Sequence, residues 1–335
     1  MAVDGQKGNG KQLLAQRISV TRRVSLLMLL ALALVCPSLQ AQSDSVRIVT
    51  LASDTVMSTS RVIQGIKGTL AKQHSALSWR HFVIPAGDQT GASIVDSIQS
   101  IKPEVIVTIG TATTTLAKAK FPNTPIVFAA VLYPDMSGFV KSLGKPGGNI
   151  TGASLNIPLE TQFSYFKKIV PHLKRVGVLY TQSTKRLIDE ARVVTAGMGL
   201  TLVAIPVNEN KDLPVALDSI MNSCQGFWSI ADPELFNPKS TKFILMTTLR
   251  KGLPVMGFSR NVVESGALFA LDFDFKAVGK QAGAIVDSIL RGARPDAISV
   301  STVDVIWFHY NEKTAKLIQI AMPEELVTVA KEVYR

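Results

Sequence analysis

Cysteine is nearly absent from this sequence, with only Cys36 and Cys224 among 335 residues. If the N-terminal segment that holds Cys36 is removed on export, Cys224 is left alone and no disulfide can form within the chain. The remaining composition, 47% apolar and 18% charged, is typical of a folded protein with about two ordinary domains. We therefore expect hydrophobic cores alone to stabilise the fold.

The short motifs of common catalytic and nucleotide sites are also absent. The chain has no G-x-G-x-x-G, and no Lys-Ser or Lys-Thr pair follows the glycines at 147 and 148, which disfavours binding of nucleotide phosphates. It has no G-x-S-x-G or H-E-x-x-H motif, and its four histidines lie in unrelated segments. We expect no catalytic residues, no metal site and no cofactor, so an exported hydrolase or isomerase is the weakest interpretation.

A hydrophobic run long enough to span a membrane is missing near the N-terminus. The apolar run 24–35 has 12 residues, whereas a membrane span needs about 20. Three arginines precede this run, and the segment "CPSLQA" after it offers small-residue cleavage after Ala41, which is the pattern of a cleaved signal peptide. We expect residues 1–41 to direct export to the periplasm and to be removed near Ala41.

A lipid anchor at Cys36 is the alternative fate of this leader. Val35 before the cysteine and Pro37 after it are poor surroundings for lipid attachment, so we favour a protein released into the periplasm. Removal of the leader, with its five basic residues and one acidic residue, lowers the formal charge from +11 to +7. The remaining basic residues are scattered and form no stripe with aromatic residues, which disfavours a nucleic-acid partner.

From residue 46 onward, short apolar segments alternate with amphipathic ones. The first five predicted strands are 46–52, 79–86, 105–110, 125–131 and 149–154. Helical spacing at 58–73, 91–101 and 111–120 separates the first four of them. The pattern restarts with a helix at 159–171 and continues with further helical spacing and with strands that include 175–180, 225–232, 253–259 and 266–274. This alternation predicts an α/β fold with two doubly wound parallel-sheet lobes.

The segment "KPGGNITGASL", residues 145–155, lies at the junction of the two alternating patterns. Pro146 and the two glycines predict a tight turn, because glycine adopts backbone conformations that other residues avoid. A plain turn is one interpretation. We favour a turn that leads into a crossover strand between the lobes, because the second pattern starts directly after it.

Three separate segments resemble one known family. They are "PIVFAAVLYPDMSGFVKSLGKPGGNITGASLNIPLETQFSYFKKIVPHLKRVGVLY" (125–180), "SIADPELFN" (229–237) and "PVMGFSRNVVESGALFALDFDFKAVGKQAGAIVDSILRGARPD" (254–296). In this order they resemble the solute-binding proteins of ABC-type importers, in the tryptophan/tyrosine-like group. The resemblance covers essentially all of residues 46–330.

The resemblance implies a type I periplasmic-binding-protein fold that traps a small molecule between two lobes joined by hinge strands. Lobe 1 would comprise 46–154 plus about 275–298, and lobe 2 would comprise 155–274 plus about 299–335. Hinges are expected near 152–155 and 272–275. The implied partner is an ABC permease in the inner membrane, and the implied state is a monomer. A ligand-sensing envelope protein that signals to a membrane receptor is the alternative, because one fold serves both roles.

The first candidate contacts follow the first predicted strand. In open parallel sheets, ligands bind beyond the carboxyl ends of the strands, where helix N-termini present free N–H groups. Asp54, Thr55 and Ser58 lie at such a position, in "ASDTVMSTS". They are candidates to contact the ligand, although residues of this kind more often cap a helix.

The second candidate loop is "IGTATTT", which follows the strand ending at residue 109. Gly110 would let the backbone approach a ligand closely. Thr111, Thr113 and Thr114 would place hydroxyl groups beside the N–H groups of a helix start, an arrangement that suits a carboxylate. Helix capping alone is the alternative here as well.

Tyr133 marks a departure from the family pattern. Relatives that bind amino acids place an aspartate just before the proline of the strand-four turn, where it can pair with the ligand's ammonium group. This sequence has Tyr133 before Pro134, and Asp135 one place late. Tyr133 would instead stack on a flat or apolar ligand, or pack in the wall of the site.

Tyr180, Asp232 and Ser259 complete the candidate site from the second lobe, each at the end of a predicted strand. For Asp232, a turn or helix cap is the alternative. The expected ligand carries a carboxylate or carbonyl group on a flat or apolar body. It would lack a free amine unless Asp135 or Asp232 points into the cleft, because an unpaired buried ammonium group is costly.

Overall fold

The computed structural model describes residues 46–74, 77–85 and 91–335. The expected signal peptide, its cleavage site near Ala41 and Cys36 lie outside these residues. Within the described part of the chain, no helix is long and apolar enough to cross a membrane.

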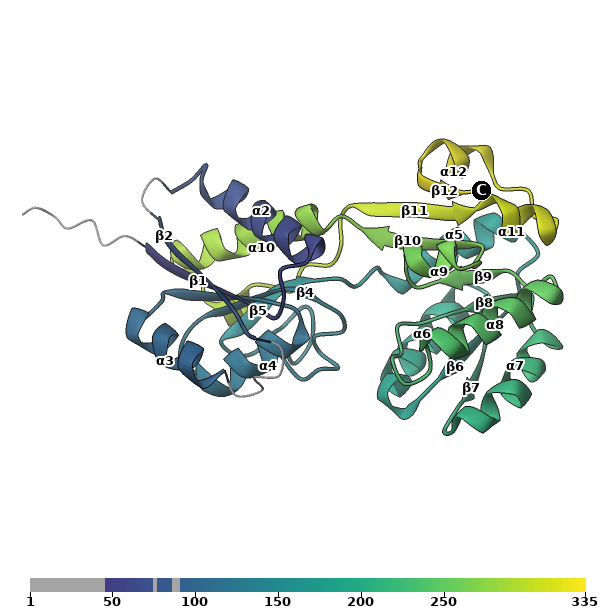
Figure 1. The fold of residues 1–335 in the computed structure, drawn as a ribbon, viewed down its shortest axis with the longest axis horizontal. Coiled ribbons are helices and arrows are strands. Elements are labelled where there is room, and N and C mark those ends of the chain that lie inside the picture. The colour runs from purple at the N-terminus through teal and green to yellow at the C-terminus, as the bar shows by residue number, and fades with distance from the viewer. Residues whose placement is uncertain (1–45, 75–76, 86–90) are drawn as a thin grey trace, which may run out of the picture. The chain divides into compact units, whose positions relative to one another are not determined.

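The first sheet has five strands, all parallel, in the order β2-β1-β3-β4-β5 (Figure 1). The strands are β1 (Val46–Ala52), β2 (Leu77–Val83), β3 (Val105–Ile109), β4 (Ile126–Val131) and β5 (Ile150–Ser154). Every residue of β3 and β5 is buried, as expected of parallel strands covered on both faces. The five strands expected from the sequence are all present.

Four helices cover this sheet: α2 (Met57–Leu70), α3 (Ala92–Ile101), α4 (Thr111–Lys120) and α10 (Phe275–Leu290). Although α10 follows much later in the sequence, it packs directly against α2 (Figure 1). A Cβ atom on Gly65 would collide with the backbone of Lys276, and one on Gly279 would collide with the backbone of Val62. Glycine at these two positions therefore allows the close approach that assigns α10 to the first sheet.

The second sheet has seven strands in the order β12-β11-β10-β9-β8-β6-β7. They are β6 (Arg175–Tyr180), β7 (Thr201–Pro206), β8 (Gly226–Trp228), β9 (Val255–Gly257), β10 (Phe269–Phe273), β11 (Ile306–Asn311) and β12 (Ala330–Tyr334). Its helices are α5 (Leu159–Ile169), α6 (Lys185–Gly197), α7 (Leu213–Met221), α8 (Pro238–Arg250), α9 (Arg260–Glu264), α11 (Glu312–Leu317) and α12 (Glu324–Thr328). The two-sheet α/β fold class is confirmed.

One strand pair departs from the expected parallel arrangement, because β10 and β11 run antiparallel. The path of the chain explains this difference. β10 ends where the chain leaves the second sheet for α10, and β11 begins where the chain returns. The last residue of β10 therefore lies beside the first residue of β11. A strand that starts beside the end of its neighbour must run antiparallel to it.

Three segments carry the chain between the two sheets: 155–158 after β5, residue 274 before α10, and 302–305 before β11. The tight turn at residues 146–149 leads into β5, which continues into the first crossing segment. Gly147 has the left-handed φ of 73° that this turn requires. The third segment is tied to the first, because the Val303 amide donates to the Asn156 carbonyl at 3.3 Å.

Candidate ligand-binding site

A cavity of about 250 Å³ lies where the carboxyl ends of strands from both sheets meet the crossing segments. We call it the inner cavity. Its walls come from the ends of β4 and β5, from the segment after β8, from the β9 end and from β10. The lining residues are Leu132, Tyr133, Leu155, Asn156, Ile157, Gln162, Trp228, Ser229, Ile230, Ala231, Met256, Gly257, Phe258, Ser259, Leu271 and Phe273. Tyr133 is the only titratable residue in this lining.

Trp228 forms a fixed aromatic wall of the inner cavity. Its side chain is 1% exposed and packs edge-on against Phe163, with ring centroids 5.0 Å apart. Its indole N–H donates to Oε1 of Gln162 at 3.0 Å, and Nε2 of Gln162 donates to the Ile157 carbonyl at 2.8 Å. This chain of hydrogen bonds links the wall to the first crossing segment, so that the ring orientation and the hinge backbone depend on each other.

Tyr133 occupies a strained position at the end of β4. Its φ is 48°, and that of Ala130 is 58°, beside an irregularity in the β4–β5 pairing. The Tyr133 amide donates to Oδ1 of Asn156 at 2.8 Å, which helps to hold this conformation. Burial, and next the Glu190 charge, raise the pKa of Tyr133 to about 12, so the phenol stays neutral. Such strain is often found at binding sites.

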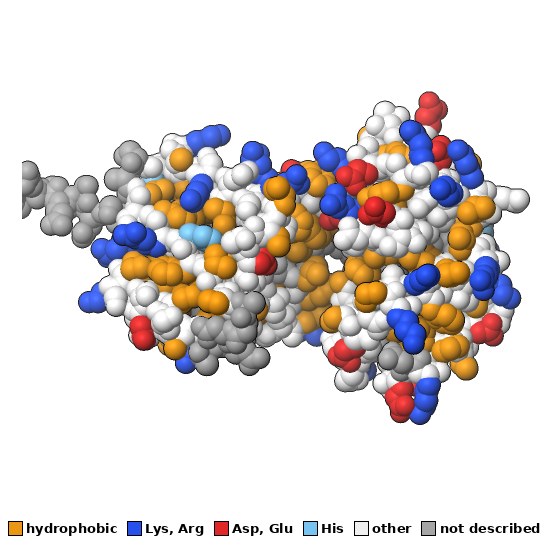
Figure 2. Space-filling model, viewed as in Figure 1, with side chains coloured by type: hydrophobic (Ala, Val, Ile, Leu, Met, Phe, Trp, Pro, Cys, Tyr) orange, Lys and Arg blue, Asp and Glu red, His pale blue; other side chains and the backbone are white. Residues whose placement is uncertain are grey.

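A second pocket of about 450 Å³ adjoins the inner cavity, and we call it the mouth pocket. Both pockets are lined by Ser259 and Phe273. The other residues of the mouth pocket are Val56, Met57, Ser58, Arg61, Arg260, Asn261, Asp272, Phe275 and Trp307. In contrast to the inner cavity, the mouth pocket carries charge. On the face drawn in Figure 2, basic and acidic side chains lie together near the segments that cross between the sheets, beside exposed hydrophobic ones.

The loop after β1 contributes one candidate residue to these pockets. Ser58 lines the mouth pocket. Asp54 instead organises its own loop: Oδ1 accepts from the Thr59 hydroxyl at 2.5 Å and from the Val56 amide at 3.2 Å. Thr55 is exposed and lines neither pocket.

The threonines after β3 use their hydroxyl groups within the protein. The buried Thr113 hydroxyl donates to the Ile109 carbonyl at 2.9 Å, and the buried Thr114 hydroxyl donates to the Gly110 carbonyl at 2.8 Å. Gly110 has a φ of 87° and precedes α4, while Thr111 is exposed. These four residues lie outside the linings of the inner cavity and the mouth pocket, so their role in ligand binding stays a prediction.

Asp232 is buried, with 1% exposure, and its carboxylate serves the protein itself. Oδ2 accepts from the Thr181 amide, the Thr181 hydroxyl and the Thr184 hydroxyl at 2.7–3.0 Å. Oδ1 accepts from the amides of Glu234 and Leu235, both at 3.2 Å. Five donors thus fix the segment that follows Ala231 in the wall of the inner cavity. Tyr180, at the end of β6, packs against the second-sheet core.

Asp135 is also engaged. Its Oδ2 lies 2.7 Å from a guanidinium nitrogen of Arg186 on α6, and its side chain is 10% exposed. Neither Asp135 nor Asp232 is among the residues that line the inner cavity or the mouth pocket. The two carboxylates that the sequence suggested for a ligand amine therefore both have partners within the protein.

Several residues that line the two pockets were not among the candidates predicted from the sequence. They include Arg61, Gln162, Trp228, Phe258 and Phe273. Trp228 and Phe258 lie within short predicted strands, and Phe273 lies within an expected hinge, so their positions carried a usable signal. Arg61 and Gln162 lie inside helices, where no local pattern distinguishes them from solvent-facing polar residues.

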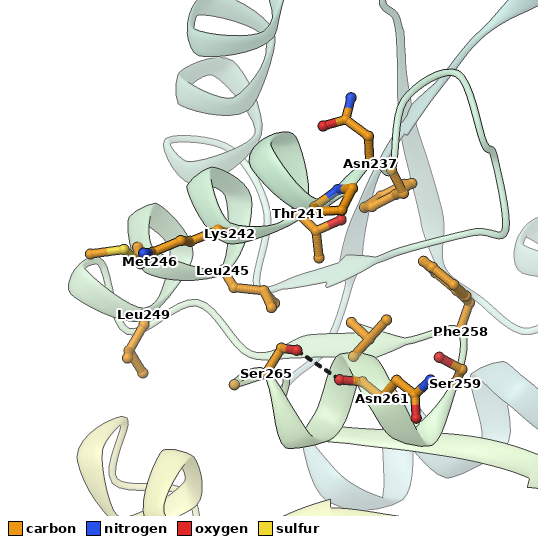
Figure 3. A pocket seen from close by; sticks show the side chains of 14 residues that line it. Asn237, Thr241, Lys242, Leu245, Met246, Leu249, Phe258, Ser259, Asn261 and Ser265 are labelled. Atoms are coloured by element: carbon orange, nitrogen blue, oxygen red, sulfur yellow. Dashed lines mark hydrogen bonds between the residues drawn. The ribbon is translucent and has the colours of Figure 1, made fainter.

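A larger groove of about 740 Å³ lies between α8 and α9. Figure 3 shows Thr241 and Leu245 of α8 facing Phe258 and Ser259 of the loop after β9. Ser265 donates its hydroxyl to the Asn261 carbonyl at 2.8 Å on the α9 side. All residues of this groove belong to one sheet and its helices, so it cannot bridge the two sheets as the inner cavity does.

Comparison with known proteins identifies the family. Residues 41–334 match the model of the ABC transporter substrate-binding protein family. The chain belongs to this family. It is 26% identical over 234 residues to the tyrosine-binding protein of Clostridioides difficile (strain R20291), a match that covers 69% of this chain and 67% of that protein.

Two solved structures of relatives share the fold. One is the ABC domain in complex with L-Trp from Streptococcus pneumonia, with a TM-score of 0.63, 22% identity, and coverage of 86% of this chain and 99% of the other. The second is the ligand-free, open structure of a substrate-binding protein with adhesive properties from Clostridium difficile, with a TM-score of 0.72, 21% identity and the same coverage. These likenesses support the type I periplasmic-binding-protein architecture.

Proposed function

We propose that this protein is the solute-binding component of an ABC importer. In this role it captures a small molecule between its two lobes in the periplasm and delivers it to a permease in the inner membrane. The observation that carries the proposal is the inner cavity, whose walls come from both sheets and from the crossing segments. A ligand held there contacts both lobes, so binding favours the closed arrangement of the lobes over the open one.

The ligand in this proposal has a flat or apolar body with a carboxylate or carbonyl group. Trp228, Phe258 and Phe273 offer aromatic surface, while Asn156, Gln162 and Ser259 offer polar groups for orientation. Relatives that carry the names of tyrosine and L-Trp ligands support an aromatic, amino-acid-like molecule. Export, cleavage near Ala41 and a monomeric state belong to the same proposal, which requires no cofactor and no catalysis.

Native mass spectrometry of protein purified from the periplasm without refolding tests this function. We expect the mass of a chain that begins near Gln42, together with a population of the protein that carries one small molecule. Small-angle scattering before and after the ligand is added back should show compaction. Conversion of the ligand into a product, or tight binding without any change in the arrangement of the lobes, would contradict capture by closure.

A further inference from the structure

The charged residues of the cleft lie in the mouth pocket, not in the inner cavity. Apart from the neutral Tyr133 phenol, the inner cavity has no titratable lining residue. The mouth pocket is lined by Arg61, Arg260 and Asp272. Because the two pockets adjoin at Ser259 and Phe273, one ligand can place an apolar body in the first and a charged end in the second.

Arg260 already has a partner, whereas Arg61 and Asp272 keep their charges available. The Arg260 guanidinium lies 3.3 Å from Oε1 of Glu332. Among the described residues, Arg61 takes part in no ion pair. Within the part of the chain that the structure describes, Asp272 accepts only from the backbone amides of Arg260 at 3.3 Å and Phe273 at 2.8 Å, so about half of its roughly four acceptor positions stay open there.

We propose that Arg61 and Asp272 are the charge-selecting residues of the ligand site. Arg61 binds the carboxylate of the ligand, and Asp272 binds its ammonium group, so the ligand is a zwitterion with a flat or apolar body. This inference rests on the proposed function and names the residues that would select its ligand. It also assigns the ammonium contact to β10, because Asp135 and Asp232 are engaged elsewhere.

The placement of the two charges also links recognition to closure. Arg61 lies on α2, which covers the first sheet, and Asp272 lies on β10 of the second sheet. A zwitterion that contacts both residues is held by both lobes at once. A ligand with only one charge would leave the other residue unpaired as the site closes, and a desolvated unpaired charge is unfavourable.

Three probes with the same indole ring separate the two roles: L-tryptophan, indole-3-propionate without the amine, and tryptamine without the carboxylate. Isothermal titration calorimetry with the ligand-free mature protein would measure the affinity of each probe. Since a hydrogen bond to a charged group is worth about tenfold or more in affinity, L-tryptophan should bind best by at least that factor. Arg61→Gln should weaken L-tryptophan and indole-3-propionate by about tenfold and leave tryptamine within about twofold. Asp272→Asn should weaken L-tryptophan and tryptamine alone.

Matched variants outside the pocket control for general effects of charge. Lys72→Gln follows α2 and Asp304→Asn precedes β11; both residues are exposed, and neither lines the mouth pocket. Each should leave all three affinities within about twofold. The probe that each site variant is expected to retain also reports that the variant is folded.

The assignment is overturned if either site variant weakens all three probes equally, if the preference for L-tryptophan persists in both, or if the wild-type protein binds none of them. Native mass spectrometry separates this failure from failure of the proposed function. A wild-type protein that binds no probe but retains a small molecule from the periplasm refutes the roles of Arg61 and Asp272 and leaves solute capture standing. A protein that does neither refutes both.

Discussion

The inner cavity and the mouth pocket adjoin each other but differ in the charge of the residues that line them. The inner cavity is lined by aromatic and amide side chains that hydrogen bonds hold in place, as Gln162 holds Trp228. The mouth pocket is lined by Arg61, Arg260 and Asp272, of which both arginines are exposed. The contrast suggests that buried residues set the shape of the site and its stability, while exposed charges set selectivity. Substitutions in the two pockets should therefore differ in their effect on the free energy of unfolding.

Trp228→Ala should have the largest effect. The side chain is fully packed, and truncating a buried tryptophan costs about 3–5 kcal/mol of unfolding free energy. It also leaves Oε1 of Gln162 without its donor and removes an aromatic wall of the inner cavity. Urea unfolding followed by circular dichroism measures the loss. Trp228→Phe keeps most of the volume and should lose clearly less; equal losses would show that packing does not explain the effect.

Asp232→Asn should have the next largest effect. An amide in place of the carboxylate gives up one oxygen acceptor and turns an NH₂ group toward donors, so we expect a loss of about 3 kcal/mol. The loss follows from the five donors that the carboxylate serves beside the cavity wall. Asp135→Asn is the matched comparison, because that carboxylate meets a half-exposed arginine; about 1 kcal/mol is expected there. Equal losses at both positions would contradict the structural role of Asp232.

Much of the fold could be predicted because it depends on local pattern. The alternation of apolar segments and helical spacing predicted β1, β6 and α4 with their observed bounds. The strands expected at 225–232 and 253–259 are only three residues long, because the chain turns after Trp228 and Gly257 into loops that line the inner cavity. Local pattern does not show where a strand stops pairing.

The candidate site was harder to predict because residue type does not reveal where a side chain points. Thr113 and Thr114 have suitable hydroxyl groups at a suitable helix start, but both donate to carbonyls one turn back, a common choice for threonine in helices. Arg61 and Asp272 are 211 positions apart, on α2 and on β10, and share a pocket only because the folded chain brings these two elements together.

His309, on β11, should make the free energy of unfolding depend on pH. It is 1% exposed, and its Nδ1 lies 3.4 Å from Oε2 of Glu332, but neither ring nitrogen makes a hydrogen bond within the described residues. Burial lowers its pKa below 6.5, outweighing the nearby Asp272 and Glu332 carboxylates. Below about pH 6.5 the unfolded chain therefore binds a proton that the folded protein resists, so stability falls as the pH falls. His309→Leu should flatten this slope between pH 7 and 5 in urea titrations, whereas exposed His172→Leu should not. An unchanged slope in His309→Leu would refute the assignment.

Arg260→Gln should have the smallest effect on stability, although Arg260 lies in the same pocket as Arg61. Its guanidinium pairs with Glu332 at 3.3 Å, but both side chains are about half exposed, at 56% and 40%. Water screens such a pair and ordering two long side chains costs entropy, so the loss should be no more than about 1 kcal/mol. The loss should shrink further in 1 M salt, where screening acts within about 3 Å. Urea unfolding at low and high salt measures it, with Glu332→Gln as the partner variant. A loss near that of Trp228→Ala, or one insensitive to salt, would mean that the mouth pocket supports the fold as the inner cavity does, and the division between shape and charge would not hold.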